Sequence, residues 1–212
     1  MKNYFFDLDG TLTDSADGII NSVIYAASTY GIEERDREAL KAFVGPPLKE
    51  SMMNRYGFDA KTADEALSRF RSRFSTIGIF ENALYEGIPA LLSQLKARGD
   101  RVILATSKPE VYARRILDHF DLTKYFDFIC GANLAETDRV EKDQVLLYAL
   151  ETSGADPKAS YMIGDRKYDV EAGNKLGLYT VGVLYGYGSR EELEAAGADM
   201  ICETTKQLKE VL

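Results

Sequence analysis

Two aspartates near the N-terminus, Asp7 and Asp9, have the spacing and the neighbours expected of a metal-dependent reaction centre. Residues 4–8 are aromatic and aliphatic enough to form a buried strand, and side chains two positions apart on a strand point to the same face. Two like charges at one strand end are unfavourable unless a cation or a transferred group lies between them. Gly10 and Thr11 then supply a turn. We therefore expect a metal ion and a reaction at this strand end.

A second segment joins a strand to hydroxyl side chains. The sequence predicts a strand from residue 101 that ends at Thr106 and Ser107, after which Pro109 opens a helix. A hydroxyl beside backbone N–H groups, where a strand meets a helix N-terminus, forms a cradle for phosphate. The other interpretation of Ser107 is an ordinary helix N-cap. Both interpretations stay open for this residue taken alone.

Two more aspartates, Asp165 and Asp169, follow a third predicted strand at 161–164. The spacing of four residues brings Asp169 back toward the strand end after one helical turn, so both acids can reach one metal site. The alternative is that Asp165 is a helix N-cap and Asp169 a surface acid. The presence of Asp7 and Asp9 in the same chain favours the metal site.

A lysine, Lys142, stands at the start of a helix that we expect over residues 140–151. Val145, Leu146 and Ala149 follow it at helical spacing and form an apolar stripe. A lysine at a helix start is more often solvated than functional. Lys142 becomes a candidate site residue only because of its place along the chain, after the hydroxyls at 106–107 and before the aspartates at 165 and 169.

Together and in this order, these segments resemble the four motifs of the haloacid dehalogenase-like (HAD) phosphatase superfamily, whose first motif is Asp-x-Asp-Gly-Thr. The form Asp-Leu-Asp-Gly-Thr-Leu-x-Asp-Ser is similar to the phosphoglycolate phosphatase branch, which carries a helical cap. The resemblance implies that Asp7 is the nucleophile that forms an aspartyl-phosphate, and that Asp9 is the general acid and then the general base. It also implies that Thr106, Ser107 and Lys142 bind the phosphoryl oxygens.

The same resemblance implies a Mg²⁺ cofactor. Asp7, Asp165 and the backbone carbonyl of Asp9 would be its protein ligands, and Asp169 would orient the water molecules around it. Oxygen ligands around a small hard cation suit Mg²⁺ better than a transition metal. An aspartate at position 9 also indicates turnover, because superfamily members that keep a long-lived aspartyl-phosphate carry threonine there.

The predicted elements form an α/β fold with one insertion. From residue 87 onward helices and strands alternate, which predicts a doubly wound parallel sheet. Residues 16–84 instead show only helical patterns, and we expect helices at 17–30, 36–44, 48–56 and 61–78. By the resemblance, 16–84 is a helical cap domain, whereas 1–15 and 85–212 form the catalytic core.

One segment of the expected cap, Gly45-Pro-Pro-Leu-Lys49, forms a rigid turn that opens a helix. It has two interpretations, a plain helix–helix turn or a substrate contact in which Lys49 meets an anionic leaving group. In relatives that resemble β-phosphoglucomutase, an arginine in the corresponding loop holds a second phosphate. Leu48 stands there in this chain, which weakens the phosphomutase alternative.

Composition favours a small partner. The net charge of −8 argues against nucleic acid, and no apolar run approaches the roughly 20 residues of a membrane span. The first residues lead straight into a strand and leave no room for a signal peptide, so we expect a cytoplasmic location. We also expect the protein to be a monomer or a weak dimer. Cys130 and Cys202 are interpreted as reduced core residues, and His119 as the end of a helix.

These features predict a Mg²⁺-dependent phosphatase of phosphoglycolate phosphatase type that hydrolyses a small phosphorylated metabolite through an aspartyl-phosphate. The alternatives are a 5′-nucleotidase of the same family, a phosphomutase, and a non-enzymatic phospho-acceptor domain like a response-regulator receiver. In receivers the phosphorylated aspartate follows the third strand. Here the Asp-x-Asp pair follows the first strand, which disfavours the receiver alternative.

Overall fold

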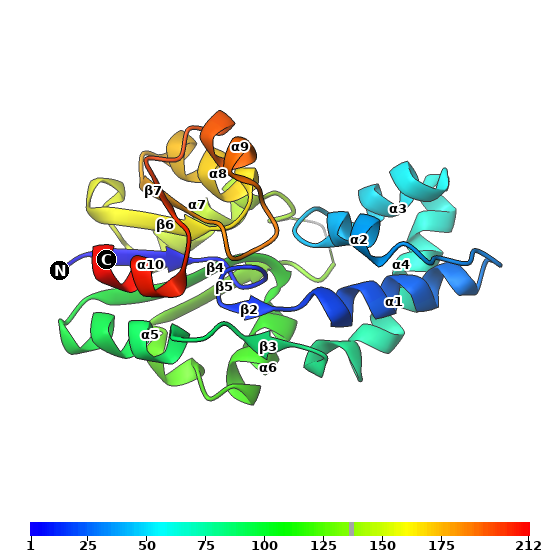
Figure 1. Ribbon diagram of the computed structural model, residues 1–212, viewed down its shortest axis with the longest axis horizontal. Helices are drawn as coiled ribbons and strands as arrows, with labels where there is room; N and C mark the ends of the chain where they lie inside the picture. The colour runs from blue at the N-terminus through cyan, green and yellow to red at the C-terminus, as the bar shows by residue number, and fades with distance from the viewer. Residues whose placement is uncertain (136–137) are drawn as a thin grey trace. The chain divides into compact units, whose positions relative to one another are not determined.

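The computed structural model describes residues 1–135 and 138–212, which form two compact units (Figure 1). One unit, which we call the core unit, joins Met1–Asp14 to Leu84–Leu212. The other, the inserted unit, is the continuous stretch Ser15–Ala83. The chain therefore leaves the core unit shortly after its first strand and returns to it after the insertion.

A parallel sheet forms the centre of the core unit. Its strands, within the described residues, are β1 (Asn3–Phe6), β4 (Arg101–Pro109), β5 (Phe128–Ala132), β6 (Ser160–Gly164), β7 (Tyr179–Val183) and β8 (Met200–Cys202). They lie in the order β5-β4-β1-β6-β7-β8, with every pair parallel. All of β1 is buried, as expected of strands that are covered on both faces and therefore apolar throughout. The predicted doubly wound α/β fold is confirmed.

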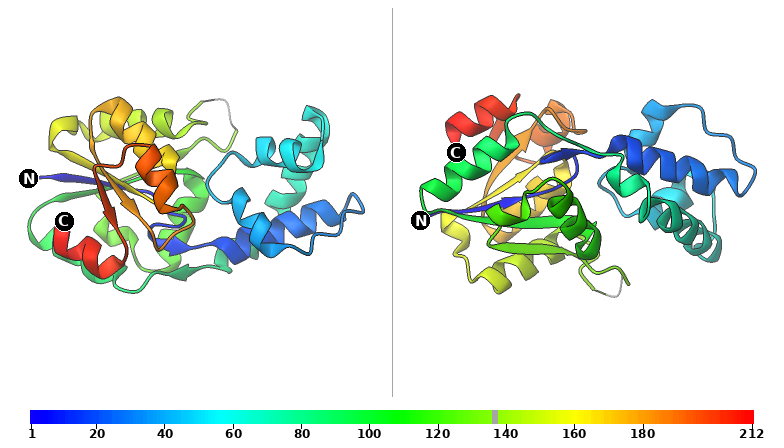
Figure 2. Two further views of the ribbon diagram at one scale, coloured as in Figure 1. Left: turned by 45° about the horizontal axis from the view of Figure 1, so that its top comes forward. Right: turned by 90° about the horizontal axis from the view of Figure 1, so that it is seen from below.

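Helices cover both faces of this sheet. Those of the core unit are α5 (Ile88–Ala97), α6 (Glu110–His119), α7 (Lys142–Ser153), α8 (Lys167–Leu176), α9 (Arg190–Ala195) and α10 (Thr205–Val211), with short 3₁₀ turns η3 (Thr123–Tyr125) and η4 (Pro157–Ala159). Figure 1 shows α7, α8 and α9 on one side and α5, α6 and α10 on the other. Gln94 donates to the carbonyl of Lys209 and joins α5 to α10, which lie side by side in Figure 2. Among the described helices, none has the length and apolar composition that crossing a membrane requires.

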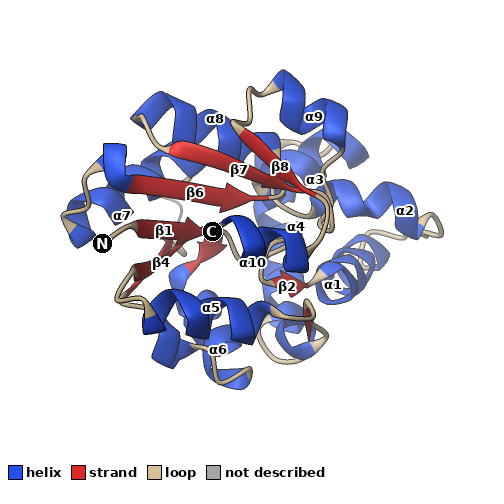
Figure 3. Cartoon of the chain, turned by 60° about the vertical axis from the view of Figure 1, so that its left-hand side comes forward, coloured by secondary structure: helices blue, strands red, loops and turns tan. Residues whose placement is uncertain are grey.

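The strand order brings three strand ends together. Phe6, the last residue of β1, pairs with Leu104 on β4 and with Ile163 on β6, and Figure 3 shows β1 between these neighbours. The chain adds β4 and β5 on one side of β1 and then crosses to the other side to form β6. Ligands of doubly wound sheets bind at such a switch point, beyond the carboxyl ends of the strands.

A second, two-stranded sheet joins β2 (Thr13–Asp14) to β3 (Ala83–Leu84), where the chain leaves and re-enters the core unit. Neither strand was predicted from the sequence, because two residues are too few to show a strand periodicity. The backbone N–H of Tyr85 also donates to the carbonyl of Leu12 at 3.2 Å. The outgoing and returning segments are thus hydrogen-bonded to each other.

The inserted unit is helical. Its elements are α1 (Ala16–Ser28), α2 (Arg37–Leu40), η1 (Lys41–Phe43), α3 (Leu48–Tyr56), α4 (Ala60–Phe74) and η2 (Gly78–Phe80). The helix α3 has its predicted bounds. The helix expected at 36–44 is instead α2 followed by η1, since Val44 is extended before the turn at Gly45 and 3₁₀ turns are common at helix ends. The helix expected to reach residue 78 ends at Phe74.

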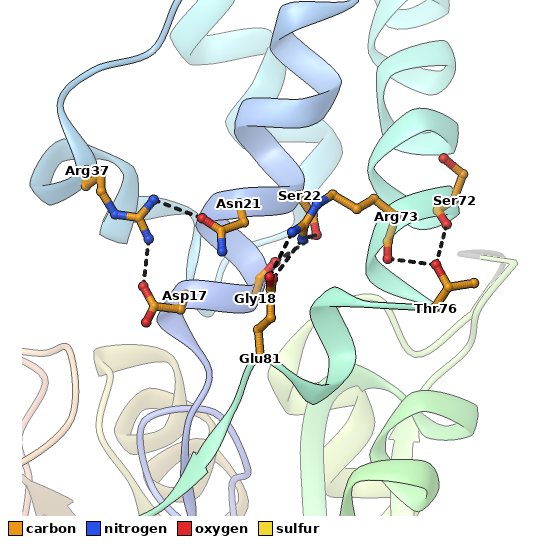
Figure 4. A network of polar contacts seen from close by, with 9 residues as sticks. All are labelled: Asp17, Gly18, Asn21, Ser22, Arg37, Ser72, Arg73, Thr76 and Glu81. Carbon is orange, nitrogen blue, oxygen red and sulfur yellow. Dashed lines mark hydrogen bonds and ion pairs between the residues drawn. The ribbon is translucent and has the colours of Figure 1, made fainter.

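A polar network ties α1 to α4 and to the residues after η2 (Figure 4). The guanidinium of Arg73 forms two 2.8 Å hydrogen bonds with the carboxylate of Glu81 and donates to Ser22 Oγ at 3.2 Å. The backbone N–H of Gly18 donates to the carbonyl of Glu81. A Cβ at Gly18 would lie 2.0 Å from the carbonyl oxygen of Gly78. Only glycine therefore allows α1 to approach this segment so closely.

We expect Gly18→Ala to destabilise the protein, although alanine is the better helix former by about 1 kcal/mol. The added methyl group collides with a backbone carbonyl, and overpacking of this kind costs about 1–3 kcal/mol. Thermal unfolding followed by circular dichroism should show a lower Tm. Ser28→Ala, an exposed change in the same helix, is the matched control and should change stability by less than about 0.5 kcal/mol. A Tm for Gly18→Ala at or above that of the wild type would contradict the packing argument.

Candidate active site

Asp7 lies directly after β1, at the switch point of the sheet. Its backbone N–H donates to the carbonyl of Ile163 at 2.9 Å, which continues the pairing with β6. Its carboxylate accepts a hydrogen bond from Lys142 Nζ at 2.6 Å, and both side chains are buried. Burial raises the pKa of Asp7 to about 6, although the ammonium of Lys142 acts in the opposite direction.

Lys142 is the first residue of α7, and its ammonium lies between two carboxylates. It is 2.6 Å from Asp7 Oδ1 and 2.6 Å from Asp169 Oδ1. The buried side chains of Val145 and Leu146 anchor the helix that presents it. Burial alone would lower the pKa of Lys142, but the two carboxylates raise it above its usual value. The interpretation of Lys142 as a solvated lysine is therefore wrong.

Asp165 follows β6 and is completely buried. It is not the N-cap of α8, because that position belongs to Arg166. Its Oδ2 accepts from the backbone N–H of Tyr187 at 2.7 Å, whereas its Oδ1 is buried without a hydrogen-bond partner among the described residues. Burial, together with the negative charges of Asp169 and Asp7, raises the pKa of Asp165 well above its usual value.

Asp7, Asp165 and Asp169 form a cluster that we call the acidic trio. Each offers one carboxylate oxygen, and these oxygens all lie within 4.8 Å of one another. Asp169 is only 3% exposed, so its alternative interpretation as a surface acid is wrong. The ammonium of Lys142 pairs with Asp7 and Asp169 but not with Asp165, so the three carboxylates leave excess negative charge in a buried place. A hard divalent cation with oxygen ligands, such as Mg²⁺, suits this donor set and the unpartnered oxygen of Asp165.

Two glycines let the backbone come close to the acidic trio. Gly10 has φ +81°, and a Cβ on it would lie 2.1 Å from Asp165 Oδ2. A Cβ on Gly164 would lie 2.1 Å from Asp169 Cγ. Since neither distance is possible for a real side chain, these positions require glycine.

Asp9 lies in the turn after β1 and has a different partner from Asp7. Its Oδ2 is 2.6 Å from Lys108 Nζ, and both side chains are buried. Because β1 ends at Phe6, the two aspartates are not successive positions on one strand face, as the sequence analysis assumed. The carboxylate of Asp9 stays outside the acidic trio. The metal contact predicted for Asp9 through its backbone carbonyl stays a prediction.

Lys108 was not among the site residues predicted from the sequence. It belongs to β4, which extends to Pro109 rather than ending at Thr106. One available signal was its type, because a lysine at the end of an apolar buried strand needs an acidic partner. The sequence gives no indication of which acid that is, because Asp9 is 99 residues away.

The two predicted phosphate-binding hydroxyls lie at the end of β4. Thr106 is 1% exposed, and its Oγ1 accepts from the backbone N–H of Lys108 at 3.2 Å. The pairing of β4 with β5 shifts register between Thr106 and Pro109, so the backbone is irregular at Ser107. The N-cap of α6 is Pro109. The N-cap interpretation of Ser107 is therefore wrong.

The predicted substrate residues Gly45 and Lys49 belong to the inserted unit. Gly45 has φ +106° and lies in the turn between η1 and α3, as expected of a helix–helix turn. Lys49 Nζ is 2.6 Å from Asp64 Oδ1 on α4. Within this unit the lysine thus has an acidic partner, and its contact with substrate stays a prediction.

Three further residues have the surroundings that the sequence analysis expected. His119 is the last residue of α6. Cys130 and Cys202 are free and buried. Burial raises the pKa of Cys130 to about 11, so this thiol stays protonated at neutral pH.

Comparisons with known proteins agree with this site. Residues 4–183 match the family model of the haloacid dehalogenase-like hydrolases. The chain is 41% identical over 210 residues to a 5′-nucleotidase of Pseudomonas aeruginosa, covering 99% of this chain and 95% of the relative. It is 30% identical over 187 residues to a phosphoglycolate phosphatase of Aquifex aeolicus, covering 88% and 86% of the two chains.

A solved structure is also similar to this chain over nearly its whole length. The crystal structure of a predicted phosphatase from Clostridium acetobutylicum superposes with a TM-score of 0.95 at 46% identity, covering 99% of this chain and 97% of the other. The similarity extends over both units of the chain, and the family match includes the segments that carry Asp7, Lys142 and Asp165. The chain belongs to the haloacid dehalogenase-like hydrolases, as an enzyme of their phosphatase group.

Proposed function

We propose that the protein is a Mg²⁺-dependent phosphatase that hydrolyses a small-molecule phosphate monoester through an aspartyl-phosphate. One observation carries the proposal: in the buried acidic trio, Asp165 Oδ1 has no hydrogen-bond partner among residues 1–135 and 138–212, while Lys142 Nζ lies 2.6 Å from Asp7. Asp7, Asp165 and the backbone carbonyl of Asp9 would hold the ion, and Asp169 would orient its water ligands. When bound, Mg²⁺ supplies positive charge that neutralises the phosphoryl oxygens and orients them for in-line attack.

The residues divide the reaction into two displacements. The carboxylate of Asp7 attacks phosphorus and forms an aspartyl-phosphate while the bond to the leaving alcohol oxygen breaks, and Asp9 gives that oxygen its proton. In the second displacement a water molecule attacks the same phosphorus, Asp9 takes the proton, and the bond to Asp7 breaks. Lys142 and Thr106, with Ser107 beside it, bind the phosphoryl oxygens. Charge neutralisation and positioning are most of what phosphoryl transfer requires.

Two substrate classes are supported by the names of the relatives. The higher identity to a 5′-nucleotidase than to a phosphoglycolate phosphatase favours a nucleoside 5′-monophosphate over phosphoglycolate. We also propose that the inserted unit is a cap that supplies specificity, with Gly45 and Lys49 as its substrate contacts. A panel of nucleoside monophosphates, phosphoglycolate and sugar phosphates, assayed with Mg²⁺, decides between these classes.

Asp7→Asn should reduce the hydrolysis of an aryl phosphate to less than a few per cent of wild type, because the amide is a poor nucleophile. Activity of the wild type should depend on added Mg²⁺ and disappear in chelator. Asp143→Asn is the matched control, since Asp143 follows Lys142 but pairs with the exposed Lys175. Substantial turnover by Asp7→Asn would refute the assignment of the nucleophile.

Asp9→Asn should slow turnover by about 10²- to 10⁴-fold, the usual contribution of general acid–base catalysis. Its backbone carbonyl remains, so the Mg²⁺ affinity measured by calorimetry should change little. If Mg²⁺ binding collapsed in this variant, the side chain of Asp9 would be a metal ligand instead. Lys108→Met should share part of the kcat loss, because the ammonium of Lys108 fixes the carboxylate of Asp9.

Mg²⁺ affinity should fall as the pH falls through about 6. Burial gives Asp7 a pKa of about 6 and raises that of Asp165 as well, so protons compete with the cation in this range. Protonation of Asp7 alone predicts a Kd about 10-fold higher at pH 5 than at pH 7.5. Calorimetry in buffers of different ionisation enthalpy should also detect released protons near pH 6. A constant Kd over this range would contradict metal binding by the acidic trio.

A further inference from the structure

The loop between β7 and α9 lies directly against Asp165. We call residues 185–188, Tyr-Gly-Tyr-Gly, the tyrosine loop. A Cβ on Gly186 would lie 2.4 Å from Asp165 Cβ, and a Cβ on Gly188 would lie 2.0 Å from the carbonyl oxygen of Asp165. The alternating glycines therefore let the loop backbone pack onto the backbone of this aspartate, while the two tyrosine side chains extend elsewhere.

Tyr187 connects two distant parts of the core unit. Its backbone N–H donates to Asp165 Oδ2 at 2.7 Å, and its hydroxyl donates to Asp14 Oδ1 at 2.8 Å. Because Oδ2 of Asp165 is engaged by the loop, its Oδ1, which is buried without a partner among the described residues, is the oxygen left for a cation. Asp14 is the last residue before the chain enters the inserted unit. Tyr187 thus contacts both the carboxylate of Asp165 and the side chain of Asp14, where the chain leaves the core unit.

Tyr185 connects the tyrosine loop to the segments where the chain leaves and re-enters the core unit. Its hydroxyl donates to the carbonyl of Thr11 at 3.1 Å. Its ring meets the ring of Tyr85 edge-on, with 4.9 Å between centroids, and Tyr85 lies just after the point where the chain returns to the core unit. The loop therefore contacts both the outgoing and the returning segment, as Figure 1 indicates where the orange loop after β7 lies beside the blue turn after β1.

We propose that Tyr187 is a positioning residue for the metal site: its hydroxyl bond to Asp14 fixes the tyrosine loop, and the loop fixes the rotamer of the Asp165 carboxylate. The inference rests on the proposed function, because it assumes that the acidic trio binds Mg²⁺. Groups that orient a metal ligand change metal affinity when they are removed, by about 10- to 100-fold for direct partners. Tyr187→Phe keeps the backbone N–H and removes only the hydroxyl, so the lower end of that range applies.

The test is the titration of Mg²⁺ alone into the metal-free protein by calorimetry. Tyr187→Phe should raise the Kd for Mg²⁺ by about 10-fold. At saturating Mg²⁺ the kcat of Tyr187→Phe for an aryl phosphate should be close to the wild-type value. A variant with a damaged fold would keep a low kcat even at saturating Mg²⁺. Tyr179→Phe is the matched control, because Tyr179 is an exposed tyrosine at the start of β7, the strand that leads into the tyrosine loop. The Kd of this variant for Mg²⁺ should equal that of the wild type.

A second variant, Asp14→Ala, removes the other partner from an exposed position. The double variant should bind Mg²⁺ about as weakly as the weaker-binding of the two single variants, because each substitution breaks the same hydrogen bond between Tyr187 and Asp14. A wild-type Kd in Tyr187→Phe, or independent losses that multiply in the double variant, would overturn the role of Tyr187. If the wild type itself bound no Mg²⁺, the proposed metal site would fail first and this inference with it.

Discussion

Three carboxylates in one buried place are the constraint on which the core unit depends. Removing charges from water costs several kcal/mol for each ion, and Asp7, Asp165 and Asp169 also repel one another. The ammonium of Lys142 lies 2.6 Å from two of them. Burial, and then the negative charge of the neighbouring carboxylates, raises the pKa of both Asp7 and Asp165. A fold that keeps such a cluster must hold its members rigidly, or they would separate and become hydrated. The cluster is therefore not a source of stability by itself, which agrees with the proposal that it binds a cation and a phosphoryl group.

The parallel sheet supplies the rigidity. Asp7 and Asp165 directly follow β1 and β6, Asp169 lies in the helix after β6, and Thr106 lies in β4. These three strands are direct neighbours at the centre of the sheet, and the buried apolar strands leave little freedom at their ends. Glycines at positions 10 and 164 remove the side chains that would otherwise hold the backbone away from the acids. Lys142 arrives on a helix that packs against β4 and β5. Each charged group is thus placed by an element whose own position is fixed by apolar packing.

The sequence predicted what is encoded locally. The fold class and the bounds of α3 follow from strand and helix periodicities, and the motifs around Asp7, Lys142 and Asp165 were assigned through their resemblance, in order along the chain, to the motifs of the haloacid dehalogenase-like family. Contacts between distant segments had no such signal: Lys108 binds an acid 99 residues away, and Tyr187 binds one 173 residues away. The expectation that Asp7 and Asp9 share one strand face failed because β1 ends at Phe6. The helix expected at 36–44 became two short elements because the turn at Gly45 tightens its end.

The contrast between locally encoded motifs and contacts from distant segments also explains why the reaction is easier to infer than the substrate. The groups gathered beyond the strand ends are carboxylates, ammonium groups and hydroxyls, all suited to a cation and a phosphoryl group, and these are common to every phosphate monoester. Nothing in that set distinguishes a nucleoside from a two-carbon acid. Discrimination between them needs contacts to the leaving group, and differences of that kind arise from shape and hydrogen bonding outside the reacting atoms. The residues proposed to be catalytic have strong motifs because the chemistry permits few residue types. Lys49, proposed as a specificity residue, has no such motif, and in the structure it pairs with Asp64.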